Sequence, residues 1–407
     1  MISDGSNAFG TILVPTSPDA ATGQYIPQDV LASLANEAPD GGVNALNPSF
    51  EIPTTMKISL GAAYYADLPV VGEGWLLSAD FLYNKLDNAT YWYDQRCENP
   101  VATSPDGRGV YDCSDGPEAL IVGSFNGGGD SKLYALSATN DWDTDYGSFD
   151  MFSSYTYSDV EDIGYGTSST ATSNYSDFAA YDRQSPREGT SSFQTEHLFK
   201  IRANWTKEFI AGYETKVSMF MTRRTGQPYS YTFSENNACV LDIGGGRCSR
   251  ESRNDDAGHL LYVPSGPNDP IFASTSFEGD AAAQQAFFDY INSSELAQYA
   301  GGIAPRNNDN SAWSTIVDIR IQQELPAFNK EHTFNLFFDI ENFGNLLNSD
   351  WGRVEVTEYE YERDVVSAKI VDGQYEYFGL NSIRSIENLR VRQQSVWQIQ
   401  FGLKYEF

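Results

Sequence analysis

Four cysteines are the residues of this sequence whose type and spacing point most directly to chemistry. They form two local pairs, Cys97 with Cys113 and Cys239 with Cys248, and each pair lies in a stretch rich in Gly, Asp and Asn. In an exported protein such pairs predict disulfides that close surface loops, whereas four free thiols are the alternative in a reducing compartment. Zinc is disfavoured because no histidine lies near either pair and neither spacing is of the CxxC type.

The sequence contains no complete motif for calcium binding or for catalysis. The carboxylates of Asp141–Asp145 have the 1-3-5 spacing of a calcium loop, but Tyr146 stands where glycine is required and Phe152 where glutamate is required. We therefore interpret this segment as an acidic turn. No histidine belongs to an HExxH motif or accompanies a GxSxG serine, so the sequence predicts no enzyme activity and no cofactor. The histidines are His197, His259 and His332.

Charged residues that alternate with apolar residues along expected strands are the candidates for a ligand path. In a barrel they would face the water-filled interior, where polar groups are required whatever passes through. A hydrated wall with internal ion pairs is the alternative for each of them. The candidates are Lys200, Arg202, Asp318, Arg320, Asp339 and Glu341.

Strands with two-residue periodicity must position these charges. In Gln394–Phe407, every second residue is apolar or aromatic and the residues between are mostly polar, which indicates a strand with one apolar face. The same alternation recurs in pairs of segments, so we predict an all-β, antiparallel fold with about nine long strands. The predicted strands are 54–68, 75–86, 132–140, 146–158, 197–207, 213–224, 313–325, 332–343 and 394–407.

The connections between these strands alternate between short and long. Such an alternation is typical of transmembrane β-barrels, which have short periplasmic turns and long extracellular loops. Trp75, Trp205 and Tyr213 would then lie at the periplasmic ends, and Trp313 and Trp397 at the outer ends, as two aromatic girdles. Within the last loop we expect a small hairpin of 353–362 with 366–377. The segment 225–311 is expected to be irregular apart from a helix over 280–299.

Charge and composition restrict the remaining possibilities. The net charge of −30 argues against nucleic acid as a partner, because such a partner requires a basic face. The sequence contains no run of about eighteen apolar residues, so it predicts no transmembrane helix. Residues 1–53 are rich in Pro, Gly, Asn and Asp and are expected to form an extracellular loop region. Met1–Gly5 is polar and acidic and does not resemble a signal peptide, so the barrel hypothesis expects further sequence upstream.

Three stretches resemble the C-terminal part of TonB-dependent outer-membrane receptors, most nearly the Oar-like group. Arg223–Ser230 (RRTGQPYS) is similar to a turn that opens an extracellular loop of that family, and 285–348 is similar to its third- and second-last strands. The ending QFGLKYEF resembles the assembly signal of a closing barrel strand. The residues that match this signal are Gln400, Gly402, Tyr405 and Phe407.

This resemblance implies a 22-stranded barrel of which 54–407 would supply the last nine strands, without the plug domain and the first strands. It implies location in the bacterial outer membrane, assembly by the barrel-assembly machinery, contact with outer-membrane lipid, and energised import of an extracellular ligand. The TonB complex would act through the missing plug. A porin or adhesin barrel and a soluble acidic β-sandwich are the alternatives.

Overall fold

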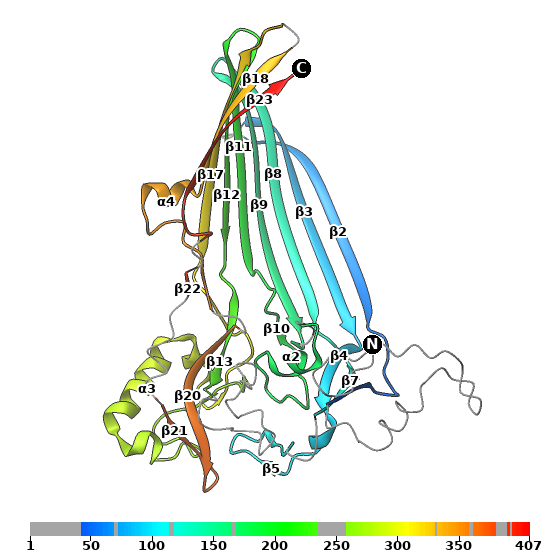
Figure 1. Ribbon diagram of the computed structural model, residues 1–407, viewed down its shortest axis with the longest axis vertical. Coiled ribbons are helices and arrows are strands. Elements are labelled where there is room, and N and C mark those ends of the chain that lie inside the picture. The colour runs from blue at the N-terminus through cyan, green and yellow to red at the C-terminus, as the bar shows by residue number, and fades with distance from the viewer. Residues whose placement is uncertain are drawn as a thin grey trace, which may run out of the picture.

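The computed structural model describes residues 42–68, 72–113, 118–164, 166, 168–234, 258–329, 332–357, 361–379, 389–390 and 393–407. Over these residues the main element is one antiparallel sheet with nine long strands (Figure 1). The prediction of an all-β, antiparallel fold is confirmed. In spatial order the strands are β2 (Thr54–Leu68), β3 (Gly72–Asp87), β8 (Asp130–Thr144), β9 (Gly147–Asp162), β11 (His197–Ile210), β12 (Tyr213–Arg224), β17 (Ser314–Pro326), β18 (Thr333–Glu341) and β23 (Gln398–Glu406).

Each long strand pairs with the long strands that precede and follow it along the chain. The last long strand, β23, pairs with β18, with Phe401 opposite Phe338. At the other edge β2 pairs with β3. In the described part of the chain β2 and β23 are not paired with each other, so the curved sheet has two unpaired edges (Figure 1).

The two ends of the sheet differ in their connections. At the end that we call the turn end, Asp145–Tyr146 joins β8 to β9 and Ala211–Gly212 joins β11 to β12. The C-terminus also lies at this end (Figure 1). At the opposite end, which we call the loop end, long segments connect β3 to β8, β9 to β11, β12 to β17 and β18 to β23. The alternation of short and long connections that the sequence predicts is therefore present.

The turn after β8 is tighter than the sequence indicates. We expected a turn over Asp141–Asp145, but β8 continues to Thr144 because Asp141 pairs with Asp150. The alternation persists through this acidic run, since Trp142 stacks on the ring of Phe149 with centroids 5.8 Å apart. The chain then reverses over two residues.

The connections at the loop end fold together into a compact region, which we call the loop assembly (the described residues of 42–53, 88–129, 163–196, 225–312 and 342–397). Here β13 (Pro228–Phe233) runs parallel to β20 (Glu362–Val371), and β20 forms a hairpin with β21 (Gln374–Phe378). The expected hairpin of 353–362 with 366–377 is thus shifted. Its turn is Asp372–Gly373, whose positive φ angles of 49° and 78° suit an Asp-Gly two-residue turn.

The segment 225–311, expected to be irregular apart from its helix, supplies much of an aromatic core. Helix α3 (Ala281–Ser293) begins at Asp280, whose side chain accepts hydrogen bonds from the amides of Ala282 and Ala283. The helix contributes buried aromatic side chains to a cluster that also draws on β13, β20 and β21. The large aromatic members are Tyr229, Tyr231, Phe233, Tyr262, Phe272, Phe277, Phe287, Phe288, Tyr375 and Tyr377.

A second part of the loop assembly is a three-stranded sheet at the start of the described chain. Strand β1 (Val43–Leu46) runs parallel to β7 (Ala119–Phe125), which pairs with β4 (Ala89–Asp94). Helix α2 (Ala171–Ser176) packs against this sheet through Tyr175, which lies beside Leu120. Residues 1–53 are therefore not all loop, although 1–41 lie outside the described residues.

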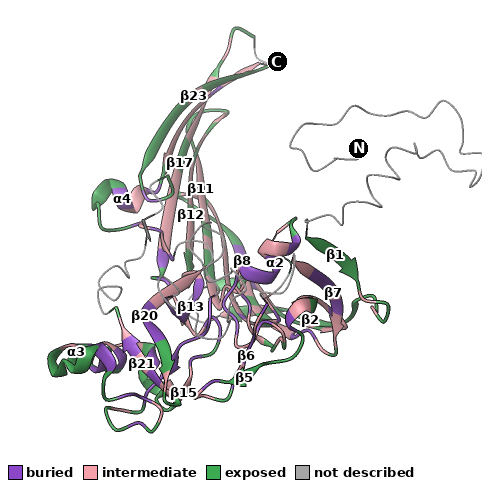
Figure 2. Cartoon of the chain, turned by 60° about the horizontal axis from the view of Figure 1, so that its bottom comes forward, coloured by how far each residue is buried: buried purple, intermediate pink, exposed green. Residues whose placement is uncertain are grey.

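The sheet of long strands and the loop assembly differ in how far their side chains are buried. Figure 2 shows buried segments concentrated in the loop assembly and long strands that are mostly exposed or half-buried. No helix in the described ranges is both long and apolar enough to cross a bilayer. The remaining elements are η1 (Gln95–Cys97), β5 (Ala102–Thr103), β6 (Gly109–Val110), β10 (Gly189–Thr190), β14 (Tyr262–Val263), η2 (Ser276–Gly279), η3 (Glu295–Tyr299), β15 (Gly302–Ile303), β16 (Asp309–Asn310), α4 (Phe343–Leu347), β19 (Glu355–Val356) and β22 (Leu389–Arg390).

Candidate functional site

Side chains of the long strands alternate between two faces of the sheet, which we call the apolar face and the polar face. Directly paired residues share a face, so the register assigns them. One ladder on the apolar face crosses four strands through Ala203, Met219, Ile319 and Ile340. The neighbouring ladder on the polar face contains Arg202, Phe220 and Asp318.

Two rows of aromatic rings bound the apolar face. At the turn end Trp142, Phe149 and Trp205 are paired across β8, β9 and β11. The rings of Trp142 and Trp75 are 6.4 Å apart. The positions of Trp75 and Trp205 therefore agree with the sequence prediction. The loop-end row contains Phe81, Tyr134, Tyr157, His197 and Trp313, with successive centroids 5.0, 6.2, 5.4 and 5.8 Å apart.

On β8, β9, β11 and β12 the band between the two rows carries a single charge, Arg223, which lies opposite Phe199 at the loop-end edge of the band. Tyr134 and Trp142 are eight residues apart, which is about 26 Å along a strand at roughly 3.3 Å per residue. That length is comparable to the apolar band of about 25 Å on membrane barrels. The uncharged side chains in this band are Leu136, Ala138, Asn140, Met151, Ser153, Tyr155, Phe199, Ile201, Ala203, Val217, Met219 and Met221.

The apolar face is open to its surroundings. Leu60 is 67% exposed, Leu136 57% and Phe401 66%. The other sheets of the described residues belong to the loop assembly, so no second sheet covers these side chains. A β-sandwich would bury such a face against its partner sheet.

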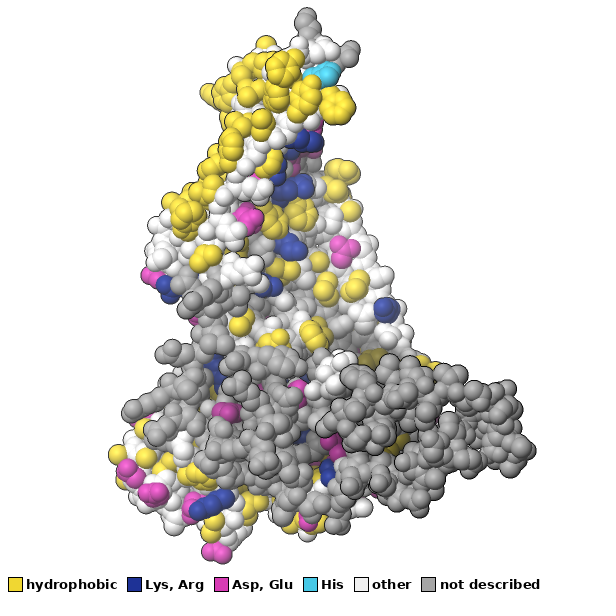
Figure 3. All heavy atoms as spheres, in the orientation of Figure 1, with side chains coloured by type: hydrophobic (Ala, Val, Ile, Leu, Met, Phe, Trp, Pro, Cys, Tyr) yellow, Lys and Arg dark blue, Asp and Glu magenta, His cyan; other side chains and the backbone are white. Residues whose placement is uncertain are grey.

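The polar face holds a groove of about 930 Å³ near β11, β12, β17 and β18. In Figure 3 this face looks toward the viewer, and Lys and Arg side chains gather on it over the middle of the sheet. Five of the six predicted ligand-path residues line the groove, namely Arg202, Asp318, Arg320, Asp339 and Glu341. Lys200 shares the face, opposite Thr222 and Ser154, but does not line the groove.

Ion pairs join part of this wall. The Arg320 Nε lies 3.5 Å from a carboxylate oxygen of Asp339, and the Arg320 guanidinium stands 4.6 Å from the centroid of the Phe337 ring. Arg202 pairs with Asp150 at 3.3 Å. Sequence reasoning missed Asp150 as the partner, although its alternation within β9 places it on the polar face.

The groove lining is balanced in charge although the whole chain is strongly acidic. It includes three arginines and three carboxylates among the described residues. Sequence reasoning also missed Arg224, one of these arginines, which lies on the polar face opposite Leu198 and Ser314. A lining of this kind can contact both anionic and cationic groups of a ligand.

The predicted assembly signal lies on an exposed edge strand. Gly402 is opposite Phe337, and a Cβ at position 402 would overlap that ring, so glycine is required for the ring to lie across β23. Tyr405 stacks near Phe334 with centroids 5.1 Å apart, and Phe407 is 92% exposed. Gln400 is opposite Asp339 on the polar face.

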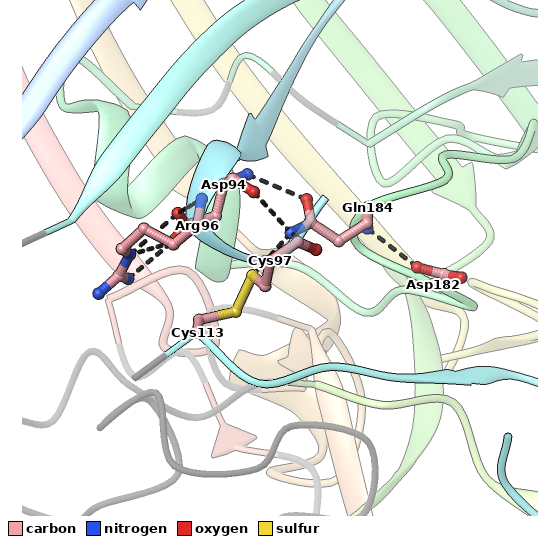
Figure 4. The surroundings of a disulfide bond; sticks show 6 residues. All are labelled: Asp94, Arg96, Cys97, Cys113, Asp182 and Gln184. Atoms are coloured by element: carbon pink, nitrogen blue, oxygen red, sulfur yellow. Dashed lines mark hydrogen bonds and ion pairs between the residues drawn. A yellow bond between two sulfur atoms is a disulfide. The ribbon is translucent and has the colours of Figure 1, made fainter. Parts of the chain in front are cut away.

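A disulfide between Cys97 and Cys113 closes one loop of the assembly (Figure 4). Gln184, from another loop, donates through its Nε2 to the Cys97 carbonyl and accepts from the Asp94 amide, each at 2.9 Å. Asp94 is buried and pairs with Arg96 at 2.6 Å. Since both sulfurs are oxidised, Asp94 and these cysteines cannot form a thiolate metal site. Cys239 and Cys248 lie outside the described residues.

A buried ion pair attaches this closed loop to the aromatic core. Arg108 and Asp106 are 2.5 Å apart with almost no exposure of either side chain, and Arg108 donates to the Leu260 carbonyl at 2.9 Å. Burial alone would raise the pKa of Asp106, but the charge of Arg108 and its hydrogen bonds hold that pKa below the ordinary value. The sequence around them, SPDGRG, indicates an ordinary turn, so this anchor was not predicted.

Two tyrosines connect further loops. The hydroxyls of Tyr229 and Tyr231 donate to one carboxylate oxygen of Asp309 at 2.5 and 2.7 Å. Burial, followed for Tyr229 by the nearby carboxylate, raises the pKa of both phenols, so they remain neutral donors. This contact fixes β13 against β16.

The histidines do not converge on one site. The ring of His197 contacts the Tyr155 hydroxyl at 2.9 Å, His259 is buried in the loop assembly, and His332 contacts Tyr405. We find no triad among them in the part of the chain that the structure describes. No known protein-family model and no curated protein matches this chain.

Proposed function

We propose that this chain forms the C-terminal part of the β-barrel of a bacterial outer-membrane receptor of the TonB-dependent class. The observation that carries the proposal is the uncovered apolar face of the nine-stranded sheet, bounded by an aromatic row at each end. In water an apolar surface of this extent is unfavourable, whereas hydrocarbon is its natural solvent. The rows have the spacing expected for the two interfaces of a bilayer.

The orientation follows from the connections. The short turns at the turn end suit the periplasm, and the loop assembly suits the cell exterior. A disulfide within the loop assembly agrees with an oxidising, exported environment. Strand β23, with its Gly402, and the Phe407 that follows it would be the segment that the barrel-assembly machinery binds.

The unpaired edges β2 and β23 need further strands, because an open edge cannot be satisfied in lipid. Strands of the same receptor outside this chain would close the barrel, and its plug would occupy the interior. In that mechanism the ligand binds to the loop assembly and plug, and the TonB complex displaces the plug. The ligand then passes the polar groove, whose arginines and carboxylates offer successive weak contacts.

An adhesin barrel is the second candidate. The loop assembly has its own aromatic core and a buried ion pair, which would give a rigid outer surface for a partner. A porin requires a wide, passively open interior, and a soluble β-sandwich requires a covered apolar face. The exposed side chains of the sheet do not support the sandwich.

Cell fractionation tests the proposal. We expect the chain, produced behind a signal peptide and together with the remaining strands and plug of its receptor, to sediment with outer membranes and to resist extraction with alkaline carbonate. Trypsin added to intact cells should cleave within the loop assembly and leave the long strands protected. Recovery in the soluble fraction without detergent would contradict the proposal.

A further inference from the structure

The apolar face contains a hollow of about 980 Å³ near its loop-end row. Small side chains form its floor, namely Ala79 on β3 and the directly paired Ala138 and Ser153 on β8 and β9. Larger side chains, among them Tyr155 and Phe199, line its walls. The hollow spans several strands and its lining is mostly apolar.

A cation lies on the rim of this hollow. Arg223 is exposed, and its guanidinium carbon lies 5.3 Å from the centroid of the Trp313 ring. Its backbone pairs with Phe199, which places the side chain on the apolar face. No carboxylate of the described residues is within ion-pair distance of Arg223. A guanidinium in this position offers paired N–H donors to an anion from outside the protein.

We propose that this hollow binds an acylated lipid with a phosphate head group from the surrounding bilayer. The phosphate is held by Arg223 beside Trp313, and an acyl chain lies over Ala79, Ala138 and Ser153. The inference rests on the proposed function, because it requires the sheet to lie in a bilayer. Charge complementarity selects this occupant, since a neutral lipid or the apolar face of a second copy leaves the guanidinium without a partner.

The geometry places both ends of such a lipid at suitable depths. Arg223 and Trp313 lie at the loop-end row, where amphipathic side chains meet head groups. The next ladder toward the turn end contains Met221, Ile201 and Ser153, so the hollow extends from the rim toward the middle of the apolar band. An acyl chain entering beside Arg223 therefore follows the membrane normal inward.

Arg223 and Arg224 provide a matched pair of variants. They are consecutive, so alternation puts Arg223 on the apolar face and Arg224 in the groove on the polar face. Native mass spectrometry of the full chain in detergent micelles would count retained lipids. The probes are phosphatidylglycerol and a diacylglycerol with the same acyl chains.

We expect the unmodified chain to retain phosphatidylglycerol about tenfold better than diacylglycerol, because one charge-assisted contact to the phosphate contributes a difference in affinity of that size. R223Q should abolish this preference, R223K should keep part of it, and R224Q should leave it unchanged. A138F should reduce retention of both lipids by filling the floor. Heat-dependent gel mobility would confirm that each variant is folded.

Equal behaviour of R223Q and R224Q would overturn the lipid site, as would retention of the two lipids that A138F does not reduce. Dimer masses without bound lipid would show that a second copy of the chain, and not a lipid, covers the hollow. If the chain is folded and monomeric yet takes up neither lipid nor detergent, the proposed function itself fails. If only the proposed lipid site is wrong, the chain should instead retain the two lipids equally.

Discussion

The sheet and the loop assembly of this protein bury their apolar side chains in opposite ways. Among the described residues, Trp75 is the only buried hydrophobic side chain on the nine long strands, whereas the loop assembly holds the rest of the buried core. In most soluble proteins the regular elements form the core and the loops cover it. The reversal is understandable if the sheet is solvated by lipid and its loops stand in water. The loops must then build their own core to be ordered.

The same difference appears in the charges. On the polar face, Arg320 and Asp339 form an open, half-exposed pair at 3.5 Å. In the loop assembly, Asp106 and Arg108 are almost completely removed from solvent. The sheet thus keeps its charges hydrated, and the loop assembly uses a charged pair as a structural anchor. Variants that affect one region and leave the other intact can therefore test the comparison.

The largest expected effect is on the loop assembly. Asp106→Asn leaves the Arg108 charge buried without its carboxylate partner, which costs about 3–5 kcal/mol. Hydrogen exchange should show lost protection in β13, β20 and β21 and unchanged protection in β8 and β9. Glu376→Gln, which breaks the half-exposed pair with Lys369, is the control and should change little. Equal loss of protection in the long strands would show that the two regions are not independent.

Removal of the disulfide should have the next largest effect. Cys97→Ser combined with Cys113→Ser frees a loop with a sequence separation of 16, which corresponds to about 3 kcal/mol in the chain-entropy model. We expect faster proteolysis between β4 and β7, while the heat-dependent gel mobility of the sheet stays unchanged. Unchanged proteolysis would mean that Gln184 and Arg108 hold this loop without the disulfide.

A pair of isoleucines on one strand tests the two faces of the sheet. Ile319→Arg places a charge in the middle of the apolar face and should cost about 2–4 kcal/mol in lipid vesicles. Ile316→Arg, on the polar face opposite Thr222, should cost less than about 1 kcal/mol. Denaturant titration in vesicles measures both. If the two variants lose the same stability, the apolar face is not in contact with lipid.

Acid should weaken the loop assembly and leave the sheet intact. Burial opposes ionisation of Asp106 and Asp269, but Arg108 and hydrogen bonds from the Ser265 and Ile271 amides keep their pKa values below the ordinary 3.8. Their stabilisation is therefore complete above that value and is lost as pH falls through the lowered values. Near-ultraviolet dichroism of the tyrosine core should stay constant from pH 7 to 5 and decline below about pH 4. A decline between pH 7 and 5 would contradict this assignment.

The long strands could be predicted because their information is local. Alternation within each segment specifies the strand and its face, and consecutive pairing needs no distant contact. For this reason, five of the six candidates that were chosen from the sequence lie together in the groove. The wrong prediction of a turn over Asp141–Asp145 shows the limit of this local signal. In that run the apolar Trp142 stands between polar residues, so the alternation of a strand is hard to distinguish from a polar turn.

The loop assembly could not be predicted in the same way because its contacts are remote in sequence. Ser230 pairs with Glu362, and Arg108 reaches the carbonyl of Leu260. Nothing near Arg108 in the sequence distinguishes it from a solvated turn arginine. The Asp372–Gly373 turn was visible, however, and would have corrected the position of the last hairpin.

Spin-label scanning along β17, from Thr315 to Gln323, tests the central claim most directly. Each position would be labelled in vesicles, and its collision rates with oxygen and with a water-soluble nickel complex measured. Oxygen should be favoured at the odd-numbered positions, with a maximum near Ile319, and the nickel complex at the even-numbered positions. Uniform exposure to the nickel complex, or uniform protection from both reagents, would contradict a sheet with one face in lipid and the other in water.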